Sequence, residues 1–176
     1  MAQPYRLPTF SHSHFATTSG DEVASLPAAR RFASRAANLS IAGDYEFFSR
    51  PEWASLRKVY GLSFRAQRQM QPDFMYAAAA SGEVDVIAGY TSDGLIAKYD
   101  LVVLDDPRRA IPPYDAMVLL APKRADDQAL RAALQPLLGR IDIATMREAN
   151  LRAAGNDATS SPDAVAQWLW EKVGNK

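Results

Sequence analysis

The segment GEVDVIAGYTSDG, residues 82–94, gives the clearest indication of the fold class of this chain. Its β-branched run from Val84 to Gly89 is typical of a buried strand. Residues 92–94 are Ser, Asp and Gly, which favour a turn, and a short helix is predicted to follow up to Lys98. A strand that leads through a tight turn into a helix is a building unit of α/β proteins.

Strand and helix signals alternate on both sides of this segment. Further strands are predicted near Ser11–Thr17 and at Leu39–Ala42, Leu101–Leu104 and Ala116–Leu120. Helices are predicted at Ser25–Asn38, from Pro51 to a stop at Gly61, from Pro72 to a stop at Gly82, and at Asp126–Leu138, Asp142–Ala153 and Ser161–Val173. Several of these helix ends are predicted from a proline in the first turn or a glycine after the last turn. The alternation predicts an α/β fold with helices on both faces of a sheet.

Composition narrows the possible functions. The chain has 176 residues, of which 48% are hydrophobic, so it can form a real core. The charges of twenty basic and twenty acidic residues cancel, which disfavours nucleic acid as a partner. A local basic patch on the surface is not excluded by this balance. There is no cysteine, so thiol catalysis and disulfides are excluded. No apolar run approaches the roughly 18 residues of a membrane-spanning helix.

Several further motifs occur in order around the first segment. They are EFFSRPEW at 46–53, VYGL at 59–62, YDLVVLDD at 99–106, PPYD at 112–115 and MREAN at 146–150. Together they resemble the glycine betaine/choline/carnitine substrate-binding proteins of osmoprotectant ABC transporters. The resemblance implies a type II periplasmic-binding fold with a mixed sheet, in which two α/β lobes close on a ligand. It also implies that the protein is not an enzyme and needs no cofactor.

The resemblance also implies a division of the chain. Residues 1–24 would be a lead-in and crossover segment, 25–113 the second-lobe α/β domain, and 114–176 the return crossover with C-terminal helices of the first lobe. Proteins of this family have a further long segment that forms most of the first lobe. A separate first-lobe chain is therefore one expected partner, beside the transporter permease. The family works in the periplasm or on the extracellular face, whereas residues 1–10 do not have the pattern of a secretory signal.

A ligand site follows from the same match. A quaternary ammonium group has no proton to donate, so aromatic rings and a carboxylate hold it, and Arg binds a ligand carboxylate. Tyr90 and Tyr114 match cage rings at the end of a strand and at the return crossover. Glu46 and Arg50 match an acid and a guanidinium that face the ligand, and four residues of helical backbone would put them on one face.

Two histidines complete the expected site. His12 and His14 stand where the family has polar and aromatic pocket positions at the first crossover, and we expect them near the same cleft. A His-x-His pair can also bind a metal, but no cysteine or suitably spaced acid accompanies it, so a metal site is not expected.

Each of these residues has a plainer explanation. Tyr90 and Tyr114 would also suit half-buried packing positions, and Glu46 with Arg50 would suit a surface ion pair. The segment from Asp105 to Arg109 is expected to be a solvated loop. Trp168 and Trp170 are expected to pack the last helix against its lobe.

Two other classes of protein stay open. An enzyme would need an acid–base pair such as Asp85 and Asp93, but no spacing singles these residues out. A degenerate lobe that serves as an interaction module, docking on a permease or on a first-lobe chain, is the stronger alternative. An exposed apolar surface on the C-terminal helices would indicate such an interaction module.

Overall fold

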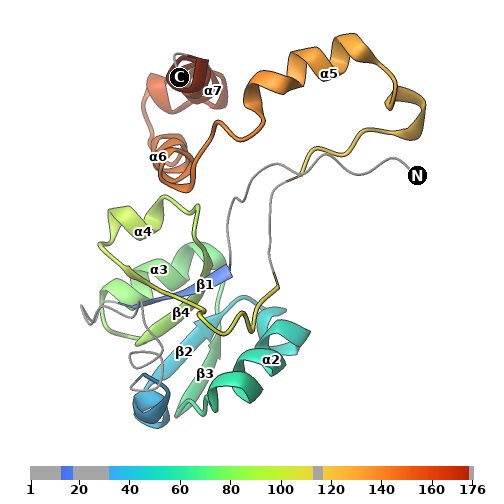
Figure 1. Cartoon of the computed structure of the whole chain (residues 1–176). Coiled ribbons are helices and arrows are strands. Elements are labelled where there is room, and N and C mark those ends of the chain that lie inside the picture. Colours follow the sequence, from blue (N-terminus) through green and yellow to red (C-terminus); the bar gives the residue numbers. More distant parts are fainter. Residues whose placement is uncertain (1–12, 18–31, 113–116, 175–176) are drawn as a thin grey trace.

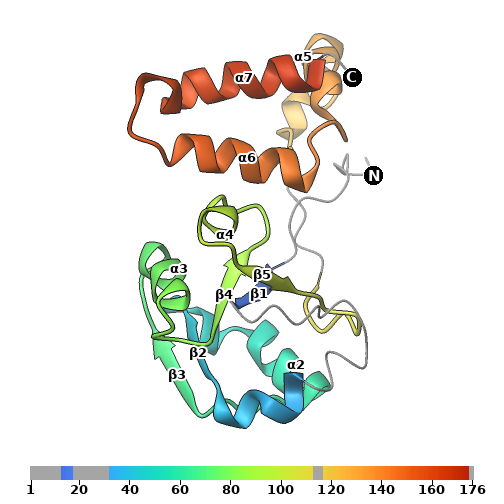
Figure 2. The same ribbon diagram turned by 90° about the vertical axis from the view of Figure 1, so that its left-hand side faces the viewer.

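The computed structural model describes residues 13–17, 32–112 and 117–174. A mixed sheet with helices on both faces forms one part of the molecule, and a helical C-terminal part lies beyond one end of it (Figures 1 and 2). The prediction of an α/β fold is therefore confirmed.

Five strands make up the sheet in the order β3-β2-β4-β1-β5. Their bounds are Ser13–Thr17 (β1), Ser40–Gly43 (β2), Ala66–Gln69 (β3), Val86–Tyr90 (β4) and Val102–Leu104 (β5). β2 pairs in parallel with β3 and β4, whereas β1 runs antiparallel to both β4 and β5. The expected strands near Ser11–Thr17 and at Leu39–Ala42, Val84–Gly89 and Leu101–Leu104 are thus present, each shifted by at most two residues.

The core has two layers, one on each face of the sheet. Adjacent residues of a strand point to opposite faces, and in β2 Ile41 joins one cluster while Ala42 joins the other. In β4 the same alternation separates Val86 from Ile87. All four side chains are fully buried, so helices must cover both faces.

One helix dominates each layer. On the first face lies α2 (Pro51–Tyr60), and on the second lie α3 (Pro72–Ala80) and the short α4 (Leu95–Lys98). Proline occupies the first turn of both α2 and α3, as expected. Gly61 ends α2 with φ of 67°, a left-handed conformation that favours glycine. These signals explain why both helices were predicted correctly.

The C-terminal part consists of α5 (Gln128–Leu134), α6 (Ile143–Ala153) and α7 (Pro162–Gly174). Asp127 and Asp142 cap α5 and α6 by accepting a backbone N–H of the first turn. The expected first helix is shorter than Asp126–Leu138, because Pro136 lies in a 3-10 turn, Gln135–Leu137, that follows it. α5 buries no residue, whereas α6 and α7 pack against each other and bury two residues each.

Short 3-10 turns complete the chain at Ala36–Asn38, Phe47–Ser49, Pro122–Arg124 and Ala158–Ser160. The described end of the helix expected at Ser25–Asn38 is helical from residue 32, and its beginning lies outside the described residues.

One predicted strand is absent from the described residues, and one observed strand was not predicted. The described residues of the expected strand Ala116–Leu120 form no strand, and Met117 and Leu119 are 56% and 76% exposed. A strand needs a neighbour for its backbone groups, and none of the described strands pairs with this apolar run. Conversely β3 was missed, because its sequence AQRQ is polar and contains no β-branched residue.

Residues 105–109, after β5, form an exposed loop, as predicted. The loop is also anchored, because Asp106 accepts hydrogen bonds from the Tyr60 hydroxyl and from Ile111 N, the second at 2.8 Å. Arg108 donates to the carbonyl oxygen of Val59 at 2.6 Å. These bonds fasten the segment to the end of α2.

One prediction about the last helix needs correction. Trp168 lies under two cations, with Arg152 Cζ at 4.2 Å and Lys172 Nζ at 4.7 Å from its ring centre. Trp170 is 47% exposed and therefore does not pack the helix as expected.

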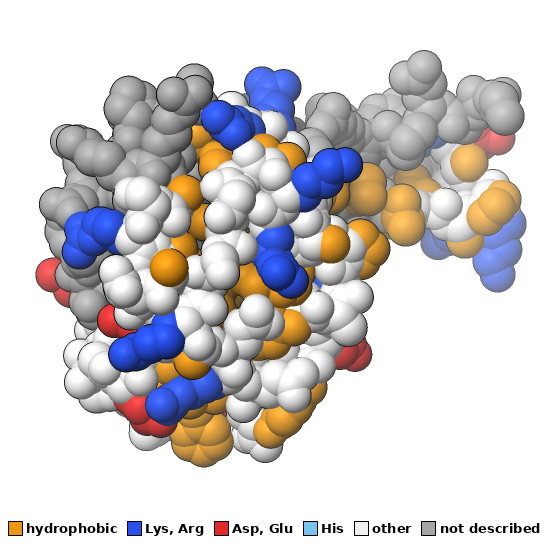
Figure 3. Space-filling model, turned by 90° about the horizontal axis from the view of Figure 1, so that it is seen from below, with side chains coloured by type: hydrophobic (Ala, Val, Ile, Leu, Met, Phe, Trp, Pro, Cys, Tyr) orange, Lys and Arg blue, Asp and Glu red, His pale blue; other side chains and the backbone are white. Residues whose placement is uncertain are grey.

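The surface of this neutral chain is locally polarised. Seen from below, one face carries many Lys and Arg side chains, with acidic side chains mainly near its outline (Figure 3). Exposed Arg57 and Lys58 lie in the last turn of α2, where the helix dipole favours cations. In the described part of the chain, no helix combines the length and the apolar character needed to span a bilayer.

Candidate functional site

Tyr90 ends β4 at the carboxyl edge of the parallel strands, the usual place for ligands in α/β proteins. Its side chain is exposed enough, at 44%, to be available to a ligand. Ala88, Gly89 and Tyr90 line a small hollow of about 50 Å³ together with residues around the start of α2. One of these is Arg50, so the structure brings two of the expected site residues to one place.

Glu46 and Arg50 form the pair that their spacing predicts. Arg50 Nη2 donates to Glu46 Oε2 at 2.8 Å, across the 3-10 turn Phe47–Ser49. The hydrogen bond to Glu46 is the main reason that the pKa of Arg50 is raised; burial opposes the shift, and hydrogen bonding with Tyr90 adds to it. Glu46 itself is 76% exposed, so it holds the guanidinium from the solvent side.

Two further carboxylates line the hollow, and sequence reasoning missed both. Asp44 accepts backbone N–H bonds from Glu46 at 2.9 Å and from Phe47 at 2.7 Å, which fixes the turn that presents Arg50. Glu52 Oε2 is buried and has no hydrogen-bond partner among the described residues. A hollow with a Tyr ring and a buried carboxylate oxygen that has no hydrogen-bond partner among the described residues suits a cation.

Gly89, which lines the hollow, lies close to the side chain of Tyr76. A Cβ atom at this position would lie 2.7 Å from the hydroxyl oxygen of Tyr76, a residue of α3 that is 2% exposed. Burial, aided by the carboxylate of Asp93, raises the pKa of Tyr76. Asp93 also accepts the N–H of Leu95 at 2.9 Å, which is the turn chemistry expected for it.

A second support comes from the C-terminal helices. Arg147 of α6 donates two N–H groups to the carbonyl oxygen of Thr91, and Asn150 donates to that of Ser92. Both acceptors follow Tyr90 directly in the chain. Sequence reasoning did not foresee these contacts, because nothing local indicates which backbone carbonyl a distant side chain will find.

The remaining expected residues are described only in part. The backbone of His14 lies in β1 opposite Gly89, and Ser13 lies opposite Tyr90. His14 is thus in a strand next to the hollow, although its role stays a prediction. His12 and Tyr114 lie outside the described residues.

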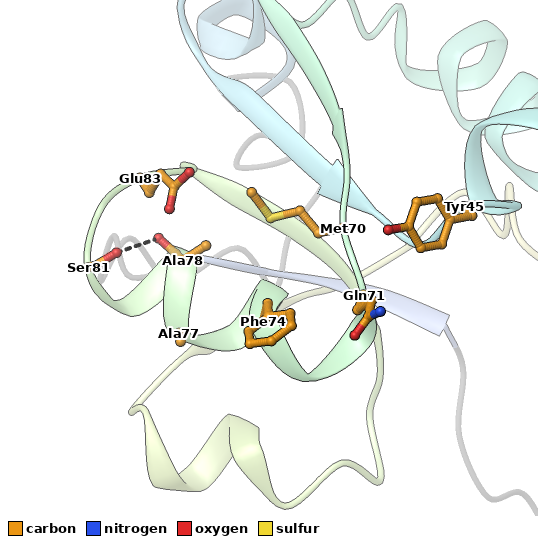
Figure 4. Close-up of a pocket in the computed structure, with 8 residues that line it drawn as sticks. All are labelled: Tyr45, Met70, Gln71, Phe74, Ala77, Ala78, Ser81 and Glu83. Atoms are coloured by element: carbon orange, nitrogen blue, oxygen red, sulfur yellow. Dashed lines mark hydrogen bonds between the residues drawn. The ribbon is translucent and has the colours of Figure 1, made fainter.

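A larger and shallower groove of about 640 Å³ lies elsewhere, beside α3 (Figure 4). Tyr45, from the segment after β2, and Phe74, from α3, line it and are 61% and 63% exposed. Its acid, Glu83, already pairs with Arg68 at 2.8 Å. The groove therefore lacks the converging polar groups of a small-molecule site.

The described part of the chain gives little support to a metal site or to acid–base catalysis. No group of three His, Asp or Glu residues there is arranged to hold a metal ion. Asp85, one of the two acids considered for catalysis, accepts the N–H and the hydroxyl of Ser40, both at 2.7 Å. This carboxylate joins the start of β4 to the start of β2.

Residues 19–171 match the family described as the substrate-binding domain of the ABC-type glycine betaine transport system. The chain belongs to this family, which consists of substrate-binding domains rather than enzymes. The expectation that the chain is not an enzyme is confirmed on this ground.

Two curated relatives illustrate the match. The chain is 31% identical over 121 residues to the carnitine transport binding protein OpuCC of Listeria monocytogenes, covering 68% of this chain and 39% of the relative. It is 26% identical over 140 residues to the ergothioneine transport permease/ergothioneine binding protein EgtU of Helicobacter pylori, covering 78% of this chain and 25% of the relative. The chain thus spans well under half the length of either relative.

A solved structure agrees with the fold. A glycine betaine/carnitine/choline ABC transporter protein superimposes with a TM-score of 0.81 at 26% identity, over 96% of this chain and 63% of that one. The periplasmic-binding fold expected from the resemblance is therefore confirmed.

Proposed function

We propose that this chain supplies one lobe of the substrate-binding component of an ABC importer for glycine betaine or a related quaternary ammonium solute. The observation that carries the proposal is the hollow shared by Arg50 and Tyr90, which come from two separate segments of the sequence. The names of the curated relatives, one a carnitine-binding protein, support a ligand of this chemistry.

Each group has a role in the proposed site. The face of Tyr90, joined by that of Tyr114, attracts the trimethylammonium group, and each ring contributes about 0.5–2 kcal/mol. Arg50 binds the ligand carboxylate, while Glu46 keeps its guanidinium in place. His12 and His14 border the cleft at the first crossover.

The hollow is too small to enclose a ligand alone, since small-molecule pockets usually measure about 300–1,000 Å³. We propose that a first lobe, in the same or another chain, supplies the opposite wall, and that residues 114–176 belong with that lobe while 25–113 form the second. α5 buries no residue, and Met117, Leu119 and Trp170 are exposed, which leaves apolar surface for such a contact.

The transporter permease is the second proposed partner, at the periplasmic or extracellular face of the membrane. The name of the Helicobacter pylori relative combines a permease and a binding protein. The exposed apolar side chains equally suit the alternative, a degenerate lobe that only docks on such a partner. Ligand binding distinguishes the two.

The test is ligand-observed NMR with glycine betaine and with glycine as the matched control. The two molecules share a carboxylate and differ in the three N-methyl groups, so an aromatic cage must distinguish them. We expect saturation transfer to the methyl groups of glycine betaine and little to glycine. Equal transfer to both, or none to either, would reject the binding role and leave the docking module.

A further inference from the structure

The turn that follows Tyr90 is held from outside the sheet by α6. Arg147 Nε and Nη2 both donate to the carbonyl oxygen of Thr91, at 2.9 and 2.7 Å. One turn further along the helix, Asn150 Nδ2 donates to the carbonyl oxygen of Ser92 at 2.8 Å. Three donors of one helix face therefore bind two consecutive carbonyls.

The helix and the turn also touch at the level of the backbone. A Cβ atom at Gly94 would lie 2.3 Å from the backbone nitrogen of Leu151, so no larger residue fits without moving α6. Leu151 follows Arg147 by one helical turn and lies on the same face. Figure 2 shows α6 lying directly beside α4, the helix that this turn begins.

We propose that α6 fixes the geometry of the β4–α4 turn and that Arg147 and Asn150 are positioning residues for the Tyr90 ring. The turn closes on Tyr90 itself, because Asp93 N donates to the Tyr90 carbonyl oxygen at 2.9 Å. The backbone that carries the ring is thereby held on one side by β1 and on the other by α6. The consequence for ligand affinity rests on the proposed function; the clamp itself does not.

Arginine suits this task better than lysine. A guanidinium is planar and directs two N–H groups at one acceptor, whereas an ammonium offers a single rotating point charge. Arg147→Lys should therefore keep the charge but lose the paired geometry. It also gives a variant that is expected to fold, in case Arg147→Ala does not.

Hydrogen exchange of the free, full-length chain tests the clamp. The amides of Asp93, Leu95 and Ile96 are hydrogen-bonded within the turn and report its opening. We expect them to exchange faster by on the order of tenfold in Arg147→Ala and in Asn150→Ala, since the first change removes two charged hydrogen bonds and the second removes one hydrogen bond. Arg147→Lys should fall between these variants and wild type.

The matched control is Arg152→Ala, on the same helix, whose guanidinium contacts Glu148 and Trp168 instead of the turn. It should leave the three amides unchanged. If Arg147→Ala, Arg147→Lys and Asn150→Ala all matched this control, the clamp would be refuted.

Glycine betaine titrations of the same variants test the positioning role. We expect the dissociation constant to rise several-fold in Arg147→Lys and to stay at the wild-type value in Arg152→Ala. Faster exchange with unchanged affinity would overturn the positioning role. A wild-type chain that bound no quaternary ammonium solute would overturn the proposed function alone, because the exchange measurement needs no ligand.

Discussion

Replacing Gly89 with alanine should destabilise the protein through a single contact. The new methyl group would lie 2.7 Å from the hydroxyl oxygen of Tyr76, while the next ring atom, Cζ, is 3.5 Å away. Tyr76 is 2% exposed and has little room to move. Overpacking of this kind costs about 1–3 kcal/mol.

The hydroxyl can be removed separately, which gives a double-mutant cycle. Tyr76→Phe alone should cost about 1 kcal/mol, because it removes the hydroxyl that interacts with Asp93. In the Phe background Gly89→Ala should become nearly neutral, since the closest remaining atom is at ordinary contact distance. The coupling between the two changes should thus be roughly 1–3 kcal/mol.

Urea unfolding followed by circular dichroism measures all four free energies. Gly174→Ala serves as the control, because a Cβ atom there meets nothing within 4 Å. If Gly89→Ala cost the same with Tyr76 as with Phe at position 76, the steric explanation would be refuted.

Three further predictions concern charged and titrating groups. Burial raises the pKa of Asp85, but the hydrogen bonds from Ser40 together have the larger effect, so the pKa is lowered overall. The ionised carboxylate therefore stabilises the fold above the unfolded pKa of about 3.9, and this stabilisation is lost as the pH falls through the folded pKa. Asp85→Asn should therefore cost about 1 kcal/mol at pH 7 and less in acid, and a constant cost from pH 7 to pH 3 in urea titrations would contradict this. Burial, with help from Asp106, raises the pKa of Tyr60 to about 12, so the stability it gives is complete below about pH 10 and is lost as the pH rises through the folded value. Tyr60→Phe should weaken the alkaline loss of stability, and an unchanged alkaline limb in thermal melts would speak against the assignment. Glu46→Gln should change the free energy of unfolding by less than about 1 kcal/mol, because the ion pair of Glu46 with Arg50 is exposed. A larger loss of stability in calorimetric melts would mean that this ion pair is structural rather than functional.

Much of the α/β domain could be predicted from the sequence because its signals are local. Proline at the start of α2 and α3, the left-handed Gly61, and the apolar run of β4 each act within a few residues. The errors occurred where pairing decides the outcome. β3 is a strand because it lies against β2, whereas residues 117–120 are not, because no described strand lies beside them.

The same distinction applies to the site. The pairing of Glu46 with Arg50 followed from a spacing of four residues, and it is present. The contact of Arg147 with Thr91, the bond of Asp85 to Ser40 and that of Tyr60 to Asp106 join residues far apart in the chain. No periodicity marks such partners, since a single side chain finds its acceptor only after the fold has formed.

Calorimetric titration of the purified chain with glycine betaine tests the central claim most directly. Micromolar capture requires about 8 kcal/mol, whereas one or two open rings supply about half of that, so we expect a dissociation constant near the millimolar range. Tyr90→Ala should abolish this binding, and Tyr45→Ala, which changes an exposed ring in the other groove, should preserve it. Micromolar binding by the chain alone, or binding that survives Tyr90→Ala, would contradict the account of a cage wall built around Tyr90.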